Sequence, residues 1–295
     1  MTQQQPSITV PSFGERLQQT FTERGALCVG IDPHSWLLSE WGLPDSAAGA
    51  ESFGRTVIAA TAGQAGIVKP QVAFFEKFGS AGFVALERVL ADAREAGLLV
   101  IADIKRGDLG TSVEAYGQAW LGAGSPLEVD AITVNAYMGV GSLDSTFALA
   151  ASGGKGVFVL SATSNPEGPS IQKAVVSEGQ FAGQSVAAAV LADVAARNAA
   201  ADTGLLGSIG VVLGATMDLG SYGIDITSAP STALTPVLAP GFGHQGAEVS
   251  GLNDLYGGYA RGVIVSESRS ILSAGPADLS RTIAHRVAEA GAVRG

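Results

Sequence analysis

The chain has 295 residues, of which 46% are hydrophobic and 15% are charged. This composition excludes wholesale disorder, because so apolar a chain can bury enough surface to collapse. The formal net charge of −10 argues against a nucleic-acid or anionic-membrane surface, since both require a dense field of Lys and Arg. We therefore expect no nucleic-acid or membrane partner, and we expect anions to bind only through local arrangements of residues.

Cysteine usage and the start of the chain indicate the compartment. Cys28 is the single cysteine, so it forms no intrachain disulfide, which fits a reducing environment. The first residues lack the basic and apolar regions of a signal peptide, and no apolar run reaches the ~18 residues that span a bilayer. These features predict a cytoplasmic protein.

Apolar runs alternate with Ala-rich helical segments along the chain. Residues 1–11 predict a short polar arm, and Phe13–Phe21 predicts a helix. Runs rich in Val, Ile and Leu then occur at Ala26–Ile31, Ile67–Lys69, Leu98–Ile104, Ala131–Asn135, Gly156–Ser161, Ile209–Gly214, Thr235–Pro240 and Gly262–Val265. Helix-like segments lie between them at Ser46–Ala65, Glu76–Ala96, Ser112–Leu121, Leu143–Ala151 and Gln180–Ala201. Gly, Pro, Ser and Thr interrupt Ala215–Leu234, which predicts a short sixth helix or a loop in its place.

The pattern predicts an α/β protein with one (β/α)₈ TIM barrel. Most runs are continuously apolar, as expected for parallel strands covered on both faces. Strand–helix alternation that reaches eight strands is typical of this barrel, and Phe13–Phe21 would close its bottom. No long linker or repeat of 20–50 residues interrupts the chain, which favours a single domain over residues 1–295. A doubly wound open sheet is the alternative.

Polar residues gather at the carboxyl ends of the predicted strands. Loops that follow barrel strands build the active site, so these positions are candidates for function. They are Asp32, Lys69, Asp103–Asp108, Asn135, Ser161–Ser164, Thr216, Gln245 and Arg269. Ordinary charge at solvent-exposed strand ends explains single members of this set better than it explains the whole set.

The sharpest signal is the group Asp103, Lys105 and Asp108. Residues two apart on a strand project to one face, so Asp103 and Lys105 should point together, with Asp108 in the following turn. Two carboxylates would then flank one ammonium and favour its charged, proton-donating form. A Schiff-base lysine needs the opposite surroundings, so the pattern favours acid catalysis. A surface ion-pair cluster is the alternative.

Two late loops predict a phosphate site. Gly241–Gly246 follows the seventh run, and Ser266–Ser270 follows the eighth. Loops in these places commonly bind phosphate through backbone N–H groups, and Arg269 would add a bidentate partner. The first loop also fits a dinucleotide fingerprint, which we reject because it lies late in the chain. A plain turn is the alternative.

Metal chemistry finds little support in the sequence. His34, His244 and His285 lack metal-ligand spacing with one another and with Cys28. Cys28 lies within the first apolar run and is expected in the core. We therefore predict no metal site.

Several motifs in order resemble the orotidine 5′-phosphate decarboxylase family, in its longer bacterial form. The resemblance runs from Leu27 to Ile271 and includes Cys28–Pro33, Val68–Gln71, Phe74–Glu76, Asp103–Gly110, Thr133–Asn135, Ser164–Pro166, the glycine loop with Gln245, and Arg269. It implies a (β/α)₈ homodimer with shared active sites that needs no cofactor or metal. Such enzymes convert orotidine 5′-phosphate to UMP and carbon dioxide in pyrimidine synthesis.

The resemblance implies a role for each matching residue. Lys105 is the expected proton donor to C6, Asp108 lies beside the departing carboxylate, and Asp103 holds Lys105 in place. Asp32 and Lys69 are expected to bind ribose hydroxyls. The other implied substrate-binding residues are Ser112, Asn135, Ser164, Gln245, Ser268 and Arg269.

The contacts that the resemblance implies for these residues differ from one another. Asp108 and Ser112 would reach the site of the other subunit, where the family usually has Thr in place of this Ser. Ser164 would read the pyrimidine edge, while Gln245 and Arg269 would hold the phosphate with backbone N–H groups near Ser268. Two alternatives stay open, namely a magnesium-dependent phosphate-binding barrel that shares D-x-K-x-x-D, and a non-catalytic nucleotide-binding barrel.

Overall fold

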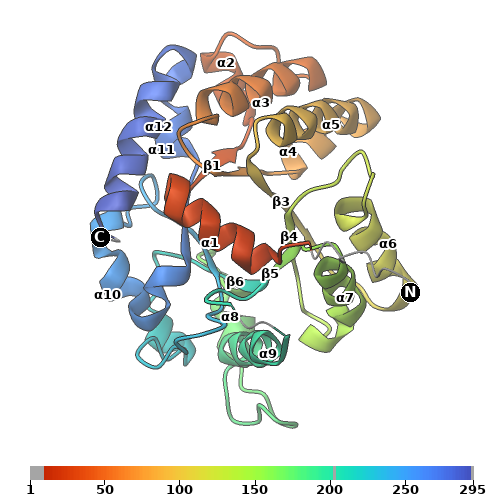
Figure 1. The fold of residues 1–295 in the computed structure, drawn as a ribbon, viewed down its shortest axis with the longest axis vertical. Coiled ribbons are helices and arrows are strands. Elements are labelled where there is room, and N and C mark those ends of the chain that lie inside the picture. The colour runs from red at the N-terminus through yellow and green to blue at the C-terminus, as the bar shows by residue number, and fades with distance from the viewer. Residues whose placement is uncertain (1–9, 202–203, 294–295) are drawn as a thin grey trace, which may run out of the picture.

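The computed structural model describes residues 10–201 and 204–293, in which eight parallel strands close into a barrel in chain order (Figure 1). The strands are β1 (Leu27–Ile31), β2 (Ile67–Pro70), β3 (Leu99–Arg106), β4 (Ala131–Val134), β5 (Gly156–Ala162), β6 (Ile209–Leu213), β7 (Val237–Pro240) and β8 (Val263–Glu267). Because β1 pairs with both β2 and β8, the sheet has no open edge. The predicted barrel is confirmed, and the open sheet is excluded.

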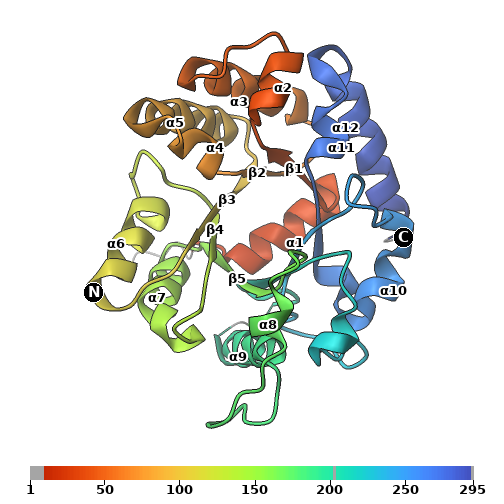
Figure 2. The same cartoon turned by 180° about the vertical axis from the view of Figure 1, so that it is seen from behind.

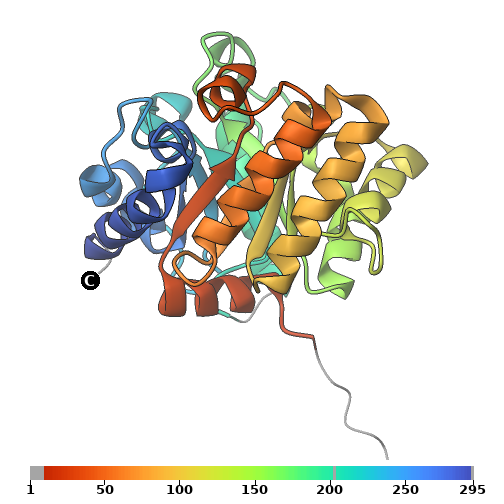
Figure 3. The same ribbon diagram turned by 90° about the horizontal axis from the view of Figure 1, so that it is seen from above.

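Helices surround the barrel on its outside (Figures 1 and 3). They are α1 (Phe13–Arg24), α2 (Ser35–Glu40), α3 (Ala47–Thr61), α4 (Ala73–Glu76), α5 (Gly79–Glu95), α6 (Gly110–Leu121), α7 (Asp144–Ser152), α8 (Pro169–Gln172), α9 (Val186–Ala201), α10 (Leu252–Tyr256), α11 (Arg269–Leu272) and α12 (Gly275–Ala292). Short 3₁₀ helices are η1 (Val140–Leu143), η2 (Leu219–Tyr222), η3 (Val249–Gly251) and η4 (Gly257–Gly262).

Two connections depart from regular helices. Between β6 and β7 only η2 forms, as the interrupted sequence of this segment predicts. The helix expected from Gln180 begins later, because the hydroxyl of Ser185 accepts a hydrogen bond from the N–H of Ala188 and caps α9 there. The residues before it form a hairpin-like segment with a bridge between Val175 and Ser185, which projects from the barrel (Figure 2).

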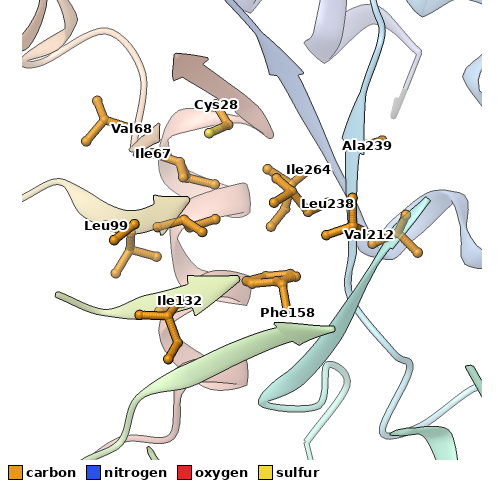
Figure 4. Close-up of a cluster of buried hydrophobic side chains, with 14 of the residues drawn as sticks. Cys28, Ile67, Val68, Leu99, Ile132, Phe158, Val212, Leu238, Ala239 and Ile264 are labelled. Atoms are coloured by element: carbon orange, nitrogen blue, oxygen red, sulfur yellow. The ribbon is translucent and has the colours of Figure 1, made fainter. Parts of the chain in front are cut away.

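The barrel interior is a packed apolar core. Side chains from several strands converge there, including Cys28, Ile67, Phe158, Leu238 and Ile264 (Figure 4). Strands covered on both faces must be apolar at nearly every position, which explains the continuous runs in the sequence. The expected core position of Cys28 is confirmed, and burial raises the pKa of its thiol to about 12.

Helix α1 closes the amino end of the barrel, as predicted (Figure 3). A capping box between Ser12 and Glu15 starts this helix. The ring of Phe13 meets that of Phe158 edge to face, with centroids 5.9 Å apart. Polar loops are thus left to the opposite end, where the carboxyl ends of the strands meet.

Three expectations bear on the chain as a whole. The polar arm predicted for residues 1–11 lies outside the described residues except for Val10 and Pro11. The single domain over residues 1–295 stays a prediction. Among residues 10–201 and 204–293, no helix has both the length and the apolar character that a membrane span requires.

The contact between α1 and the barrel can be tested at Gly156. A Cβ added there would lie 2.4 Å from the ring of Phe13, so Gly156→Ala should lower the free energy of unfolding by about 1–3 kcal/mol through overpacking. Urea denaturation measures this loss. Gly291→Ala is the matched control, since a Cβ there meets nothing within 4 Å. Equal stability of the two variants would contradict the packing described.

Candidate active site

The carboxylate of Asp103 is the centre of a polar cluster at the open end of the barrel. Its Oδ2 accepts hydrogen bonds from Lys69 Nζ and Gln71 Nε2, both at 3.0 Å. Its Oδ1 accepts from Lys105 Nζ at 2.6 Å and from Thr133 Oγ1 at 2.7 Å. Strands β2, β3 and β4 therefore share one anion.

Two charged side chains of the Asp103 cluster are buried. Asp103 is 8% exposed and Lys69 is 7% exposed. Burial raises the pKa of Asp103, but Lys69 and Lys105 outweigh it and hold that pKa well below its usual range. Burial likewise lowers the pKa of Lys69, but the carboxylates of Asp103 and Asp32 outweigh it and raise that pKa. Both groups are therefore ionised at neutral pH.

Lys105 reaches Asp103 through an irregular backbone rather than a regular strand. Its φ of +48° lies in the left-handed region, and the register of β3 on β4 shifts between Ala102 and Arg106. A non-glycine residue in this conformation costs roughly 1–2 kcal/mol. The N–H of Lys105 donates to Thr133 Oγ1 at 3.1 Å, and Arg106 Nη2 binds both carboxylate oxygens of Glu76. These contacts hold the strained segment in place.

The expectation that two carboxylates flank Lys105 is wrong within one chain. Asp108 Oδ1 accepts a hydrogen bond from the N–H of Leu109 at 2.8 Å, and in the described part of the chain Asp108 forms no ion pair with Lys105. After β3 ends at Arg106, Gly107 packs so closely on the backbone of Asn135 that a Cβ would lie 2.0 Å from its oxygen. One carboxylate, Asp103, holds the ammonium.

A second polar group lies at the ends of β1 and β8. Asp32 Oδ1 and Ser268 Oγ are buried and have no hydrogen-bond partner among the described residues. Gly30 allows this close approach, because a Cβ there would lie 2.6 Å from the Cβ of Ser268. Buried polar atoms are normally satisfied, so the hydrogen-bonding capacity of both atoms is unmet within the described residues.

Arg269 lies at the same end of the barrel, near the residues that follow β1. Its charge and that of Lys77 lower the pKa of His34, in addition to the larger effect of burial, while Asp32 raises it. The His34 ring packs on Phe74 at a centroid distance of 4.2 Å. Within the described residues Arg269 forms no ion pair, which leaves its guanidinium open to an anion.

The other predicted residues differ in how they meet. Ser164, after β5, contacts Gln245, after β7, at 3.5 Å between Oγ and Oε1. Asn135 is exposed and its Oδ1 accepts a hydrogen bond from the N–H of Tyr137. Ser112 is exposed on α6, away from the Asp103 cluster. The structure therefore brings Ser164 and Gln245 together, but it does not bring Asn135 or Ser112 to them.

Sequence reasoning assigned no role to two members of the cluster, Gln71 and Thr133. Thr133 is the one polar residue of β4 and is 1% exposed. A hydroxyl inside an otherwise apolar run was the available signal, because a buried polar side chain needs a partner.

Among the described residues, no group of three His, Cys, Asp or Glu side chains could hold a metal ion.

Comparison with known proteins agrees with this geometry. The model of the orotidine 5′-phosphate decarboxylase / HUMPS family matches residues 25–278. The chain belongs to this family. The resemblance read from the motifs is therefore confirmed, and its Asp103–Asp108 segment lies where the family match runs.

Members of the decarboxylase family resemble the chain along nearly its whole length. The orotidine 5′-phosphate decarboxylase of Streptomyces coelicolor is 48% identical over 279 residues, which cover 94% of this chain and 95% of that protein. The Salinispora tropica decarboxylase is 47% identical over 265 residues, with 90% and 91% covered. These names confirm the expected enzyme class, a carboxy-lyase.

Solved structures of the decarboxylase family share the fold. A Streptomyces avermitilis protein assigned this activity superposes with a TM-score of 0.89 at 43% identity, and 99% of each chain is covered. The Leishmania donovani decarboxylase superposes with a TM-score of 0.74 at 28% identity, with 96% of this chain and 98% of that chain covered. The closed barrel is therefore the fold of the family.

The Asp103 cluster predicts a pH-dependent contribution to stability. Asp103→Asn leaves two ammonium groups without their anion and should lower the free energy of unfolding at pH 7 by about 3 kcal/mol. Because the folded pKa of Asp103 is depressed, this contribution is present above the unfolded pKa of about 3.9 and is lost as pH falls further. The elevated pKa of Lys69 keeps its own contribution through the neutral range.

Urea denaturation from pH 3 to pH 8 measures this difference between the wild type and Asp103→Asn. The control is Asp278→Asn, which removes an exposed partner of Arg281 and should change stability by less than about 1 kcal/mol. A difference between wild type and Asp103→Asn that does not change with pH would contradict the assigned ion pairs.

Proposed function

We propose that this member of the decarboxylase family converts orotidine 5′-phosphate to UMP and carbon dioxide without a cofactor or metal. The observation that carries the proposal is the Lys105 ammonium, which is paired with the Asp103 carboxylate although the Lys105 side chain is 45% exposed and the Asp103 side chain only 9% exposed. Such a group is a charged proton donor in a set position. A cytoplasmic role in pyrimidine synthesis follows as an expectation.

The chemistry needs one cation at one carbon. When carbon dioxide leaves, the electron pair of the broken C–C bond stays on C6 of the pyrimidine ring. The Lys105 ammonium stabilises this charge where it develops and then donates its proton to C6. Asp103 remains ionised and keeps the Lys105 side chain directed at C6.

The remaining residues bind parts of the substrate far from C6. Asp32 Oδ1, buried without a partner, accepts a ribose hydroxyl, and Lys69 donates to the ribose. Ser164 reads the pyrimidine edge, while Gln245, Arg269 and backbone N–H groups near Ser268 hold the phosphate. Binding energy from the phosphate closes the loops at Ser164–Gly168 and Gly243–Gly251 over the substrate. Asn135 adds a substrate-binding position at the end of β4.

The active unit is a homodimer in which Asp108 and Ser112 serve the partner subunit's site. Two observations support this assembly. Among the described residues Asp108 forms no ion pair with the Lys105 of its own chain, and large apolar side chains that follow Asp108 and Asn135 in sequence are exposed. Exposed apolar groups in one region often mark an interface. The group comprises Leu109, Tyr116, Tyr137 and Met138.

Loss of orotidine 5′-phosphate absorbance tests the activity directly. The wild type should retain its rate in excess chelator, whereas a magnesium-dependent sugar-phosphate enzyme would lose it and would leave orotidine 5′-phosphate intact. Lys105→Ala should lower kcat by about a thousandfold or more and change UMP affinity less. Lys155→Ala is the control, since Lys155 pairs with Glu128 away from the site. A wild-type kcat in Lys105→Ala, or a protein that binds UMP but is inert, would contradict the proposal.

Mixed dimers test the shared site. Lys105→Ala and Asp108→Ala homodimers should both be inactive, but a dimer with one chain of each kind has one site with both residues intact. Random reassortment makes about half the dimers mixed, so roughly a quarter of all sites should regain activity after the two variants are unfolded and refolded together. Separate refolding is the control. Proven mixed dimers without a gain would place Asp108 outside the partner's site.

A further inference from the structure

The buried carboxylate of Glu267 has no part in the proposed mechanism. This residue ends β8 and is 1% exposed. Its Oε1 accepts a hydrogen bond from Arg286 Nη2 at 2.7 Å, and its Oε2 accepts from Arg286 Nε at 2.8 Å. The Oγ of Ser270 donates to the same Oε2 at 2.6 Å. One anion therefore ties β8 to the start of α11 and to α12.

The glycine loop after β7 packs against the same group. Gly243 has a φ of +69°, and a Cβ there would lie 2.7 Å from Ser270 Oγ and 3.0 Å from Glu267 Oε2. The loop is closed on itself by hydrogen bonds from the N–H of Gly243 to the oxygen of Ala247 and from the N–H of Gly246 to the oxygen of Gly243. No side chain fits between this loop and the carboxylate.

The glycine loop after β7 and the segment at the start of α11 both contact Glu267, and each carries a proposed phosphate ligand. Gln245 lies within the loop that starts at Gly243, and Arg269 lies between Ser268 and Ser270 in sequence. Because Ser270 and Gly243 are held in place by Glu267, the backbone that carries Arg269 and Gln245 is held in place as well. Arg286 supplies a compensating charge, so the buried anion is paired as buried charges must be.

We propose that Glu267 is a positioning residue for recognition of the substrate's 5′-phosphate. It sets the relative position of the Gln245 loop and the Arg269 segment through Ser270, Gly243 and Arg286, and it does not touch the substrate. This inference rests on the proposed function, which places the phosphate at Gln245 and Arg269.

Two variants test whether Glu267 positions the phosphate-binding segments. In Glu267→Gln the amide nitrogen must face Arg286 or Ser270, which are both donors there, so the hydrogen-bond set cannot form. Ser270→Ala removes one bond without changing a charge. We expect the dissociation constant of UMP to rise about tenfold in Glu267→Gln and about threefold in Ser270→Ala. The dissociation constant of uridine, which lacks the phosphate, should stay within about twofold.

Isothermal titration of UMP and uridine measures both constants. The matched control is Asp130→Asn, which removes a mostly buried carboxylate from Arg16 at the other end of the barrel. It should lower the melting temperature and leave the ratio of the two constants unchanged. A loss of stability alone cannot move that ratio, so the ratio separates positioning from folding.

Arg269→Ala separates this inference from the proposed function. If Arg269→Ala weakens UMP but Glu267→Gln and Ser270→Ala do not, or if they weaken uridine equally, the positioning role of Glu267 is overturned. If Arg269→Ala leaves UMP affinity unchanged, the proposed phosphate site is overturned, and the inference falls with it. Should Glu267→Gln fail to fold, Ser270→Ala decides the question alone.

Discussion

Two ammonium groups that share one buried carboxylate are the constraint on which the catalytic end of this barrel depends. Asp103 accepts four hydrogen bonds from three strands or their ends, including those of Lys69 and Lys105. A buried anion with both oxygens satisfied has little freedom to rotate. Lys105 is therefore fixed by its partner, although nearly half of its side chain remains accessible to substrate.

The barrel supplies the rigidity that this arrangement requires. The left-handed backbone of Lys105 is unfavourable by itself and persists because its neighbours hold it. Thr133 from β4 binds the N–H of Lys105, and Arg106 binds Glu76 of α4. Strain in the backbone of Lys105 is thus offset by contacts with adjoining elements.

The sequence predicted the features that depend on burial of apolar residues. It did not predict the features that depend on the local direction of the backbone. All eight strands were recognisable, because strands covered by helices must be apolar on both faces. The pairing of Asp103 with Lys105 was also predicted. The residue pattern alone put Asp108 beside the same ammonium, but the two form no ion pair among the described residues, since the spacing D-x-K-x-x-D does not reveal a left-handed residue at Lys105. Glu267 went unnoticed because its partner Arg286 is 19 positions away in sequence, on helix α12.

The closed amino end of the barrel determines how molecules travel. Phe13 of α1 seals that end against Phe158, and the interior behind the Asp103 cluster is filled with apolar side chains. Among the described residues this packing leaves one open end, so we expect molecules to reach and leave Lys105 through that mouth. On the proposed function, carbon dioxide would leave by the route through which the nucleotide entered.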